Sequence, residues 1–146
     1  MTSNEKGART EGAVLSVLLH EGYNVLLPFG VSRYDLVIEV EGEFKRVQCK
    51  TGRLGRGGGS LEFNVSSTPP DGKARNYDGQ IDYFGVYLAQ QGQVYLIPAE
   101  ELAGLQREAT MRLGPARNGQ SKGTRDARPY LLDPMACSSE DGAAVS

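Results

Sequence analysis

The chain has 146 residues, of which 39% are hydrophobic and 23% charged, which fits a single globular domain with a core of its own. Its formal net charge of −2 excludes a uniformly basic coat for nucleic acid. The distant pair Cys49 and Cys137 and a single histidine favour neither a disulfide framework nor a zinc site. The sequence has no apolar run long enough for a membrane span or a signal peptide, so we expect a cytoplasmic protein.

The charges are distributed unevenly along the chain. From Lys45 to Arg56 there are five cations and no acid, and residues 106–130 carry six cations against two acids. The acidic surplus lies in the N-terminal half and in the last residues. The sequence therefore predicts a patchy surface.

The first predicted element is a helix from about Glu5 to Glu21, with Ser3 or Asn4 as its cap and Gly22 at its end. Its apolar face follows helical spacing. Projecting that face backward reaches Glu11, so we expect a carboxylate on the buried side. The residues that define the face are Leu15, Leu18, Leu19 and Gly22.

Three strands are predicted next, over residues 23–27, 33–40 and 43–51, and the tight turn at residues 41–42 makes the last two an antiparallel hairpin. Asp35 stands at the start of the second strand. On the third strand, Arg46, Gln48 and Lys50 share one face because side chains two apart point the same way. Burying Gln48 and Lys50 there costs desolvation energy that a partner or a function must offset.

The remaining elements follow from turn signals and alternation. We expect a mobile basic loop over residues 52–59, a strand over 61–65, a turn at 69–72 and a hairpin of strands 81–88 and 93–97. A short helix is predicted over residues 99–107. The domain is expected to span residues 1–114, followed by a largely flexible tail over 115–146 that is first basic and then acidic.

Four polar residues converge in this arrangement: Glu11, Asp35, Gln48 and Lys50. Two carboxylates and an amide oxygen suit a hard divalent cation such as Mg²⁺. A nearby lysine can orient or deprotonate a water and stabilise the charge on a phosphate under attack. The pattern indicates phosphodiester hydrolysis.

Here the sequence resembles the PD-(D/E)XK nuclease superfamily, and most closely its group I intron-associated homing endonucleases, with a core similar to Holliday-junction resolvases. The resemblance covers residues 5–105. The matching segments are GARTEGAVLSVLLHEGYNVLLPFG, RYDLVIEV, FKRVQCKTG and IDYFGVYLAQQGQVYLIP.

The resemblance implies an α/β fold with a restriction-endonuclease-like core, in which helices flank a central mixed sheet. It implies that Glu11, Asp35 and Gln48 bind Mg²⁺, with Mn²⁺ as a substitute, and that Lys50 is the catalytic lysine. The activity implied is metal-dependent hydrolysis of DNA by a homodimer or higher homo-oligomer. Two positions depart from the motif: Tyr34 replaces its proline, and Gln48 replaces a carboxylate.

Five cations are candidates for contacts with DNA phosphates, although an ordinary solvated face is the alternative. They are Arg46, Arg53, Arg56, Lys73 and Arg75.

Simpler readings of the four site residues also stay open. Glu11 could interact with the helix dipole, Asp35 could close a turn, and Lys50 could lie exposed on an edge strand. For the whole chain, one alternative is a catalytically inactive nucleic-acid-binding module with the same fold. The other is a structural or interaction protein with a buried Glu11–Lys50 ion pair.

Overall fold

The computed structural model describes residues 1–67, 75–76, 79–116 and 124–132, and its first element is helix α1, Ser3–His20. Thr2 caps the helix, because its side chain accepts from the Glu5 backbone N–H while the Glu5 carboxylate accepts from the Thr2 N–H. The expected helix is confirmed, but its cap, Thr2, lies one residue before Ser3 and two before Asn4, the two predicted caps.

The buried face of α1 differs from the predicted one. It consists of Thr10, Val14 and Leu18, whereas Leu19 is 53% exposed and Glu11 is exposed. The reason lies in the sheet, where Gly85 leaves room for the helix. A Cβ on Gly85 would come within 2.8 Å of Val14 Cγ1, so the missing side chain lets α1 approach at this point. Glu11 therefore lies at the flank of the buried face.

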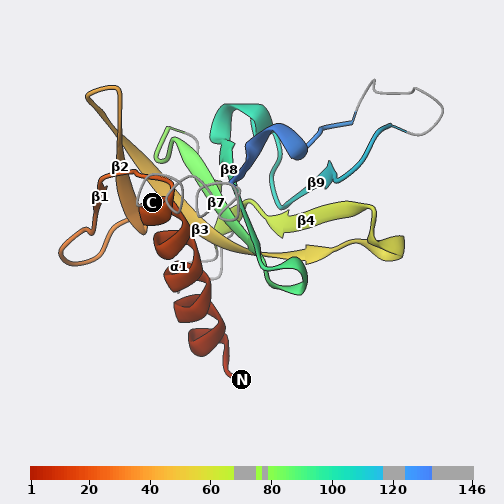
Figure 1. Ribbon diagram of the computed structural model, residues 1–146, viewed down its shortest axis with the longest axis horizontal. Coiled ribbons are helices and arrows are strands. Elements are labelled where there is room, and N and C mark those ends of the chain that lie inside the picture. Colours follow the sequence, from red (N-terminus) through yellow and green to blue (C-terminus); the bar gives the residue numbers. More distant parts are fainter. Residues whose placement is uncertain (68–74, 77–78, 117–123, 133–146) are drawn as a thin grey trace, which may run out of the picture.

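The sheet has eight strands in the order β1-β2-β3-β7-β8-β10, with β4 on β3 and β9 on β4 (Figure 1). The strand β3 pairs in parallel with β7, and the other pairs are antiparallel. The sheet is therefore mixed, as predicted. Its strands are β1 (Val25–Leu26), β2 (Leu36–Val40), β3 (Glu43–Leu54), β4 (Ser60–Asn64), β7 (Tyr83–Leu88), β8 (Gln93–Pro98), β9 (Glu108–Arg112) and β10 (Leu131–Leu132).

Smaller elements complete the described residues. A separate two-stranded sheet joins β5 (Ser66–Ser67) to β6 (Arg75–Asn76). The 3₁₀ helices are η1 (Arg56–Gly58), η2 (Ala89–Gln91), η3 (Ala99–Leu102) and η5 (Arg128–Tyr130). No helix within the described ranges is both long and apolar enough to span a membrane.

Two hydrophobic cores lie on the sheet: one includes Val47 of β3, and the other includes residues of β4 and β7, which pair with β3. One core lies beneath α1 and contains Val14, Leu18 and Val47. The other contains Phe63 and Phe84, whose rings lie 5.8 Å apart, and it joins β4 and β9 to β7 and β8. Packing on both sides explains why the central strands are rich in apolar residues.

Three predictions need correction. The helix expected over residues 99–107 is only the 3₁₀ helix η3, because Gly104 takes a positive φ of 90° soon after it. The loop expected from residue 52 begins later, since β3 runs to Leu54. Part of the expected flexible tail packs on the molecule: Ala127 is fully buried and β10 pairs with β8. Residues 69–72, 117–123 and 133–146 lie outside the described residues.

Candidate active site

The predicted site lies where one edge of β3 changes partner. The strand β2 pairs with β3 up to Leu36 opposite Val47, and β4 pairs with it from Glu62 opposite Arg53. The other edge of β3 is paired continuously with β7 over this stretch. Residues 48–52 of β3 therefore lie in a fork between two strands that diverge, with the sheet intact behind them.

Asp35 occupies this fork and takes the place of a strand partner. Its backbone N–H donates to the Val47 carbonyl at 2.9 Å, and its Oδ2 accepts from the Cys49 backbone N–H at 2.9 Å. The β2–β3 pairing ends at Leu36 opposite Val47, so these two bonds attach Asp35 to β3 just beyond the paired residues. The carboxylate thus lies along the open edge of β3.

Glu11 reaches the same carboxylate from α1. Partial burial of the Glu11 carboxyl raises its pKa, and the negative charge of Asp35 and a side-chain hydrogen bond with Asp35 raise it further. The two carboxyl groups therefore lie close enough to interact. Two ionised carboxylates in contact repel, so the site favours either a proton or a cation between them.

Lys50 lies on β3 and interacts with the charge of Asp35. Its Nζ donates to the Ser66 carbonyl at 2.8 Å. Burial lowers the pKa of Lys50 to about 8, the charge of Asp35 opposes this change, and the charge of Arg33 adds to it. Lys50 is thus half-buried, which removes the reading of a fully exposed edge lysine.

Sequence reasoning did not include two threonines that join the helix to the strand at this site. Thr10 is buried, and its Oγ1 lies 2.6 Å from Thr51 Oγ1. Thr10 directly precedes Glu11, and Thr51 directly follows Lys50. A buried hydroxyl needs a hydrogen-bond partner, so this contact fixes the position of α1 against β3. The only sequence signal was the adjacency to the two site residues.

The donor set fits a hard divalent cation if Gln48 takes part. Within the described residues, no group of three or more His, Cys, Asp or Glu side chains is placed to hold a metal ion. Glu11 and Asp35 are two oxygen donors in contact, and the half-buried Gln48 can add an amide oxygen. The repulsion between the two acids is the feature that a cation would relieve.

Comparisons with known proteins agree with this geometry. A family model described as PD-(D/E)XK endonuclease matches residues 1–133. The chain belongs to the PD-(D/E)XK endonuclease family.

The fold of this PD-(D/E)XK endonuclease is also that of a solved relative. The structure of a bacterial homing endonuclease, I-Ssp6803I, matches with a TM-score of 0.64 and 22% sequence identity. The match covers 98% of this chain and 95% of that chain. The predicted restriction-endonuclease-like fold is confirmed. No curated protein matched the chain.

Two of the cations predicted to contact DNA form ion pairs in this endonuclease. Arg46 donates through its backbone N–H at 2.8 Å and its Nε at 3.2 Å to Asp82 Oδ2. Burial favours the neutral form of Asp82, but its bonds to Arg46 outweigh this and hold the pKa of Asp82 below its usual value. Arg53 pairs with Glu108 and, at 3.6 Å, with Glu62. These pairs join strands.

Of the other three predicted DNA contacts, one lies away from the fork, one lies on β6, which pairs with the Ser66–Ser67 strand beside Lys50, and one falls outside the described residues. Arg56 is exposed in η1, at the far end of the β3–β4 hairpin. Arg75 lies in β6, and nothing is described of its side chain. Lys73 falls outside the described residues.

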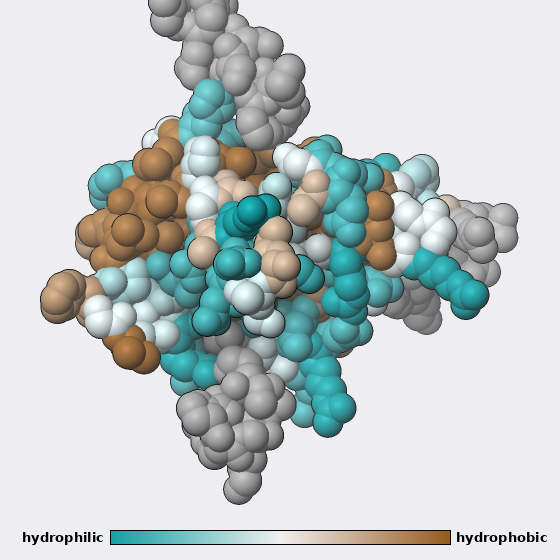
Figure 2. All heavy atoms as spheres, turned by 90° about the horizontal axis from the view of Figure 1, so that it is seen from below, coloured by the Kyte–Doolittle hydropathy of each residue, from teal (hydrophilic) through white to brown (hydrophobic). Residues whose placement is uncertain are grey.

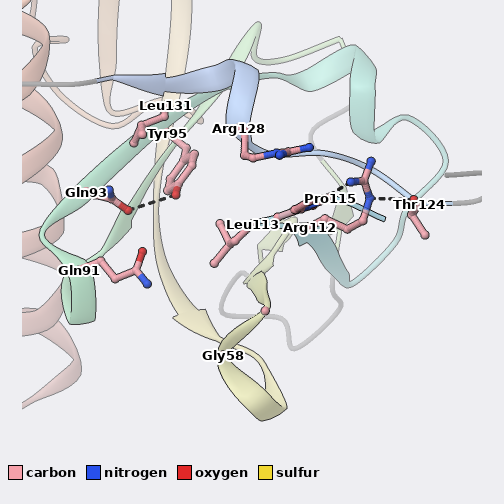
Figure 3. Close-up of a pocket in the computed structure, with 12 residues that line it drawn as sticks. Gly58, Gln91, Gln93, Tyr95, Arg112, Leu113, Pro115, Thr124, Arg128 and Leu131 are labelled. Atoms are coloured by element: carbon pink, nitrogen blue, oxygen red, sulfur yellow. Dashed lines mark hydrogen bonds between the residues drawn. The ribbon is translucent and has the colours of Figure 1, made fainter. Parts of the chain in front are cut away.

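A hollow of about 710 Å³ lies elsewhere on the endonuclease, and none of the four predicted site residues lines it. Figure 3 shows Arg112 and Arg128 on its wall, with Tyr95 bonded to Gln93. Arg112 donates to Thr124 and to the Gly114 carbonyl, and Arg128 pairs with Asp126. The Arg112–Thr124 bond holds the C-terminal segment against β9, and the pairing of β10 with β8 holds it against β8. The polar groups named on the wall of the hollow therefore have a structural role.

Proposed function

We propose that this endonuclease hydrolyses DNA phosphodiester bonds with the aid of a divalent cation, Mg²⁺ or in its place Mn²⁺. The observation that carries the proposal is the contact between Glu11 and Asp35 beside Lys50, at an open strand edge. Glu11, Asp35 and Gln48 would hold the cation. When bound, such a cation acts as a Lewis acid on a phosphoryl oxygen.

Asp35 has the central role in this proposal because it interacts with Glu11, with Lys50 and with the backbone of β3. The Cys49 N–H donates to Oδ2 of Asp35 and so fixes the orientation of the carboxylate. The other carboxylate oxygen is therefore also held in a defined position. Its charge acts on both Glu11 and Lys50. Asp35 therefore sets the spacing between the metal-binding acids and the lysine.

Lys50 is suited to interact with the scissile phosphate. Its pKa of about 8 keeps most of the side chain protonated near neutral pH, and partial burial strengthens its electrostatic interactions. The ammonium can donate to the oxygen on which negative charge develops during attack by water. The Ser66 carbonyl holds it in place meanwhile.

Gln48 sets the charge of the proposed cation site. With glutamine there, the acids contribute two negative charges in place of the three that a carboxylate at this position would give. An amide keeps a ligand oxygen but binds a hard cation more weakly. We therefore expect lower cation affinity than in a three-carboxylate site.

Double-strand cleavage requires two copies of the chain. One site of this kind attacks one strand, and the two strands of a duplex are antiparallel. A two-fold symmetric homodimer places two identical sites in matching orientations. We propose that the active form is a homodimer or a higher homo-oligomer.

The test is cleavage of supercoiled plasmid and of branched DNA with Mg²⁺ or Mn²⁺. Wild type should nick or linearise DNA only with metal, and Lys50→Ala and Glu11→Ala should lose this activity while remaining folded by circular dichroism. Lys45→Ala is the matched control, because Lys45 lies on the same strand but pairs with exposed Glu43. It should cleave like wild type.

The inactive nucleic-acid-binding module is the second candidate, and Gln48 is the observation that favours it. It predicts DNA binding by wild type without cleavage on any substrate. In that case Gln48→Glu is the next variant to test, since it restores the third carboxylate. A structural or interaction protein with a Glu11–Lys50 ion pair predicts instead that Lys50→Ala unfolds the chain, at a cost of about 3–5 kcal/mol.

A further inference from the structure

The loop between β1 and β2, residues 27–35, carries two large apolar side chains that contact almost nothing. The side chains of Phe29 and Val31 are both fully exposed to solvent. The loop projects beyond the end of β2 that bears Asp35 (Figure 1). Viewed from below, hydrophobic side chains gather on this side of the molecule (Figure 2). Exposing such groups costs solvation energy, which suggests that a ligand covers them.

The base of this loop is tied to the active site. Ser32 Oγ donates to the Tyr34 carbonyl at 2.6 Å, and Arg33 Nε donates to Gln80 Oε1 at 2.6 Å. The next residue is Asp35, held by Val47. Because six residues separate Phe29 from Asp35, the tip lies within about 20 Å of the carboxylate even if fully extended. It therefore stays beside the fork.

The loop is near enough to the fork to reach a DNA duplex that has a phosphate there. Apolar side chains inserted between base steps unstack and kink a duplex, and a fully exposed phenylalanine suits that contact. Arg33 places a positive charge at the base of the loop, close enough to Lys50 to lower the pKa of that side chain. A cation beside an apolar tip matches DNA, which offers phosphate and stacked bases together.

A second copy of the chain fits the tip less well. At the tip, Phe29 and Val31 offer well under about 500 Å² of surface, whereas a standard interface buries about 800 Å² on each partner. Leu26 and Leu27, which are 41% and 65% exposed, lie at the base of the loop, behind the projecting tip. Gly30 between Phe29 and Val31 takes a positive φ of 94°, which makes a narrow turn. The loop is therefore a narrow projection, which is a poor shape for a broad contact with a second copy.

We propose that Phe29 and Val31 form a wedge that inserts into DNA beside the scissile phosphate and unstacks the bases there. The inference rests on the proposed function, since it takes DNA as the substrate. Distortion next to the fork would bring the backbone toward Asp35 and Lys50. Phe29 supplies the stacking surface, and Val31 supports it.

The experiment measures DNA unwinding, which needs no knowledge of the target sequence. A closed circular plasmid is relaxed by a metal-independent topoisomerase in EDTA, where cleavage is blocked, in the presence of each protein. Wild type should lower the plasmid linking number, and Phe29→Ala should reduce that change at least twofold per bound protein. Phe44→Ala is the matched control, since Phe44 is 64% exposed on the neighbouring hairpin. It should unwind like wild type.

The remaining outcomes separate this inference from the proposed function. Equal unwinding by Phe29→Ala, Phe44→Ala and wild type would overturn the wedge while DNA cleavage stands. If wild type binds no DNA by gel shift, both proposals fail. A change from dimer to monomer in Phe29→Ala by sedimentation, with unwinding unchanged, would assign the loop to a subunit contact. Melting temperatures of all three proteins should agree, because neither side chain is packed.

Discussion

Two groups of charged side chains lie three residues apart on β3 and differ in how their charges are arranged. At Arg53, one cation lies between two acids from neighbouring strands, Glu62 and Glu108, so opposite charges meet. At Lys50, opposite charges also lie close together, Asp35 with Lys50, but each of them has a like-charged neighbour: Glu11 beside Asp35, and Arg33 beside Lys50. The first group holds three strands together. The second is not arranged for stability, which is typical of a functional site.

The largest effect is expected where the second group is centred. Asp35→Asn keeps an oxygen for the Cys49 N–H but removes the charge that acts on Glu11 and Lys50. We expect the DNA nicking rate to fall about 100-fold or more, since several kcal/mol of transition-state stabilisation are lost. Single-turnover rates on supercoiled plasmid measure this. A rate within a factor of three of wild type would contradict the role of Asp35.

The next effect concerns how the second group is held in place. Thr10→Val keeps shape but removes the hydroxyl that meets Thr51, so α1 loses a fixed contact beside Glu11. We expect the nicking rate to fall about 10-fold, because small displacements of catalytic groups cost rate steeply. Thr10→Ser should restore it. A purely structural role for Thr10 would lower the melting temperature of Thr10→Val and leave the rate of the folded protein unchanged.

A smaller effect is expected at Arg46, which sequence reasoning assigned to DNA. Its pair with Asp82 joins the β3 edge to the start of β7, and both side chains are partly exposed. Arg46→Met should lower the free energy of unfolding by about 1 kcal/mol. Urea denaturation measures this. Unchanged stability together with weaker DNA binding would return Arg46 to the DNA-contacting set.

The smallest expected effect tests whether the acid in each of the two groups raises or lowers the stability of the protein. The raised pKa of Glu11 means that folding favours its neutral form, so its ionised form lowers stability above its unfolded pKa. Without metal at pH 7, Glu11→Gln should therefore raise the melting temperature slightly. Glu62→Gln should lower it, because Glu62 faces Arg53. Calorimetry of both variants decides, and changes of the same sign would contradict the comparison.

The sequence predicted the elements that bear the site because their signals are local. The β2–β3 hairpin follows from alternation and the Glu41-Gly42 turn, and both strands appear where expected. Glu11 and Asp35 lie close enough to interact, while their role in binding a cation stays a prediction. The face of α1 could not be predicted, because Gly85, 71 residues after Val14, decides where the helix packs.

The ion-pair partners of Arg46 and Arg53 could not be predicted from the sequence either. Asp82 lies 36 residues from Arg46, and Glu108 lies 55 residues from Arg53. The five cations from Lys45 to Arg56 have no acid nearby in the sequence, so nothing in the sequence indicated that Arg46 and Arg53 form ion pairs. The strand β9 was missed because the helix-forming residues before it, around Ala99–Leu102, obscured the short alternation of Glu108–Arg112.

The most direct test of the central claim is a calorimetric titration of Mn²⁺ into the protein without DNA. The account predicts that wild type binds Mn²⁺, that Glu11→Gln weakens this binding at least 10-fold, and that Glu62→Gln leaves it unchanged. Loss of binding in both variants alike, or no loss in Glu11→Gln, would contradict the claim that like charges at the β3 fork form a cation site.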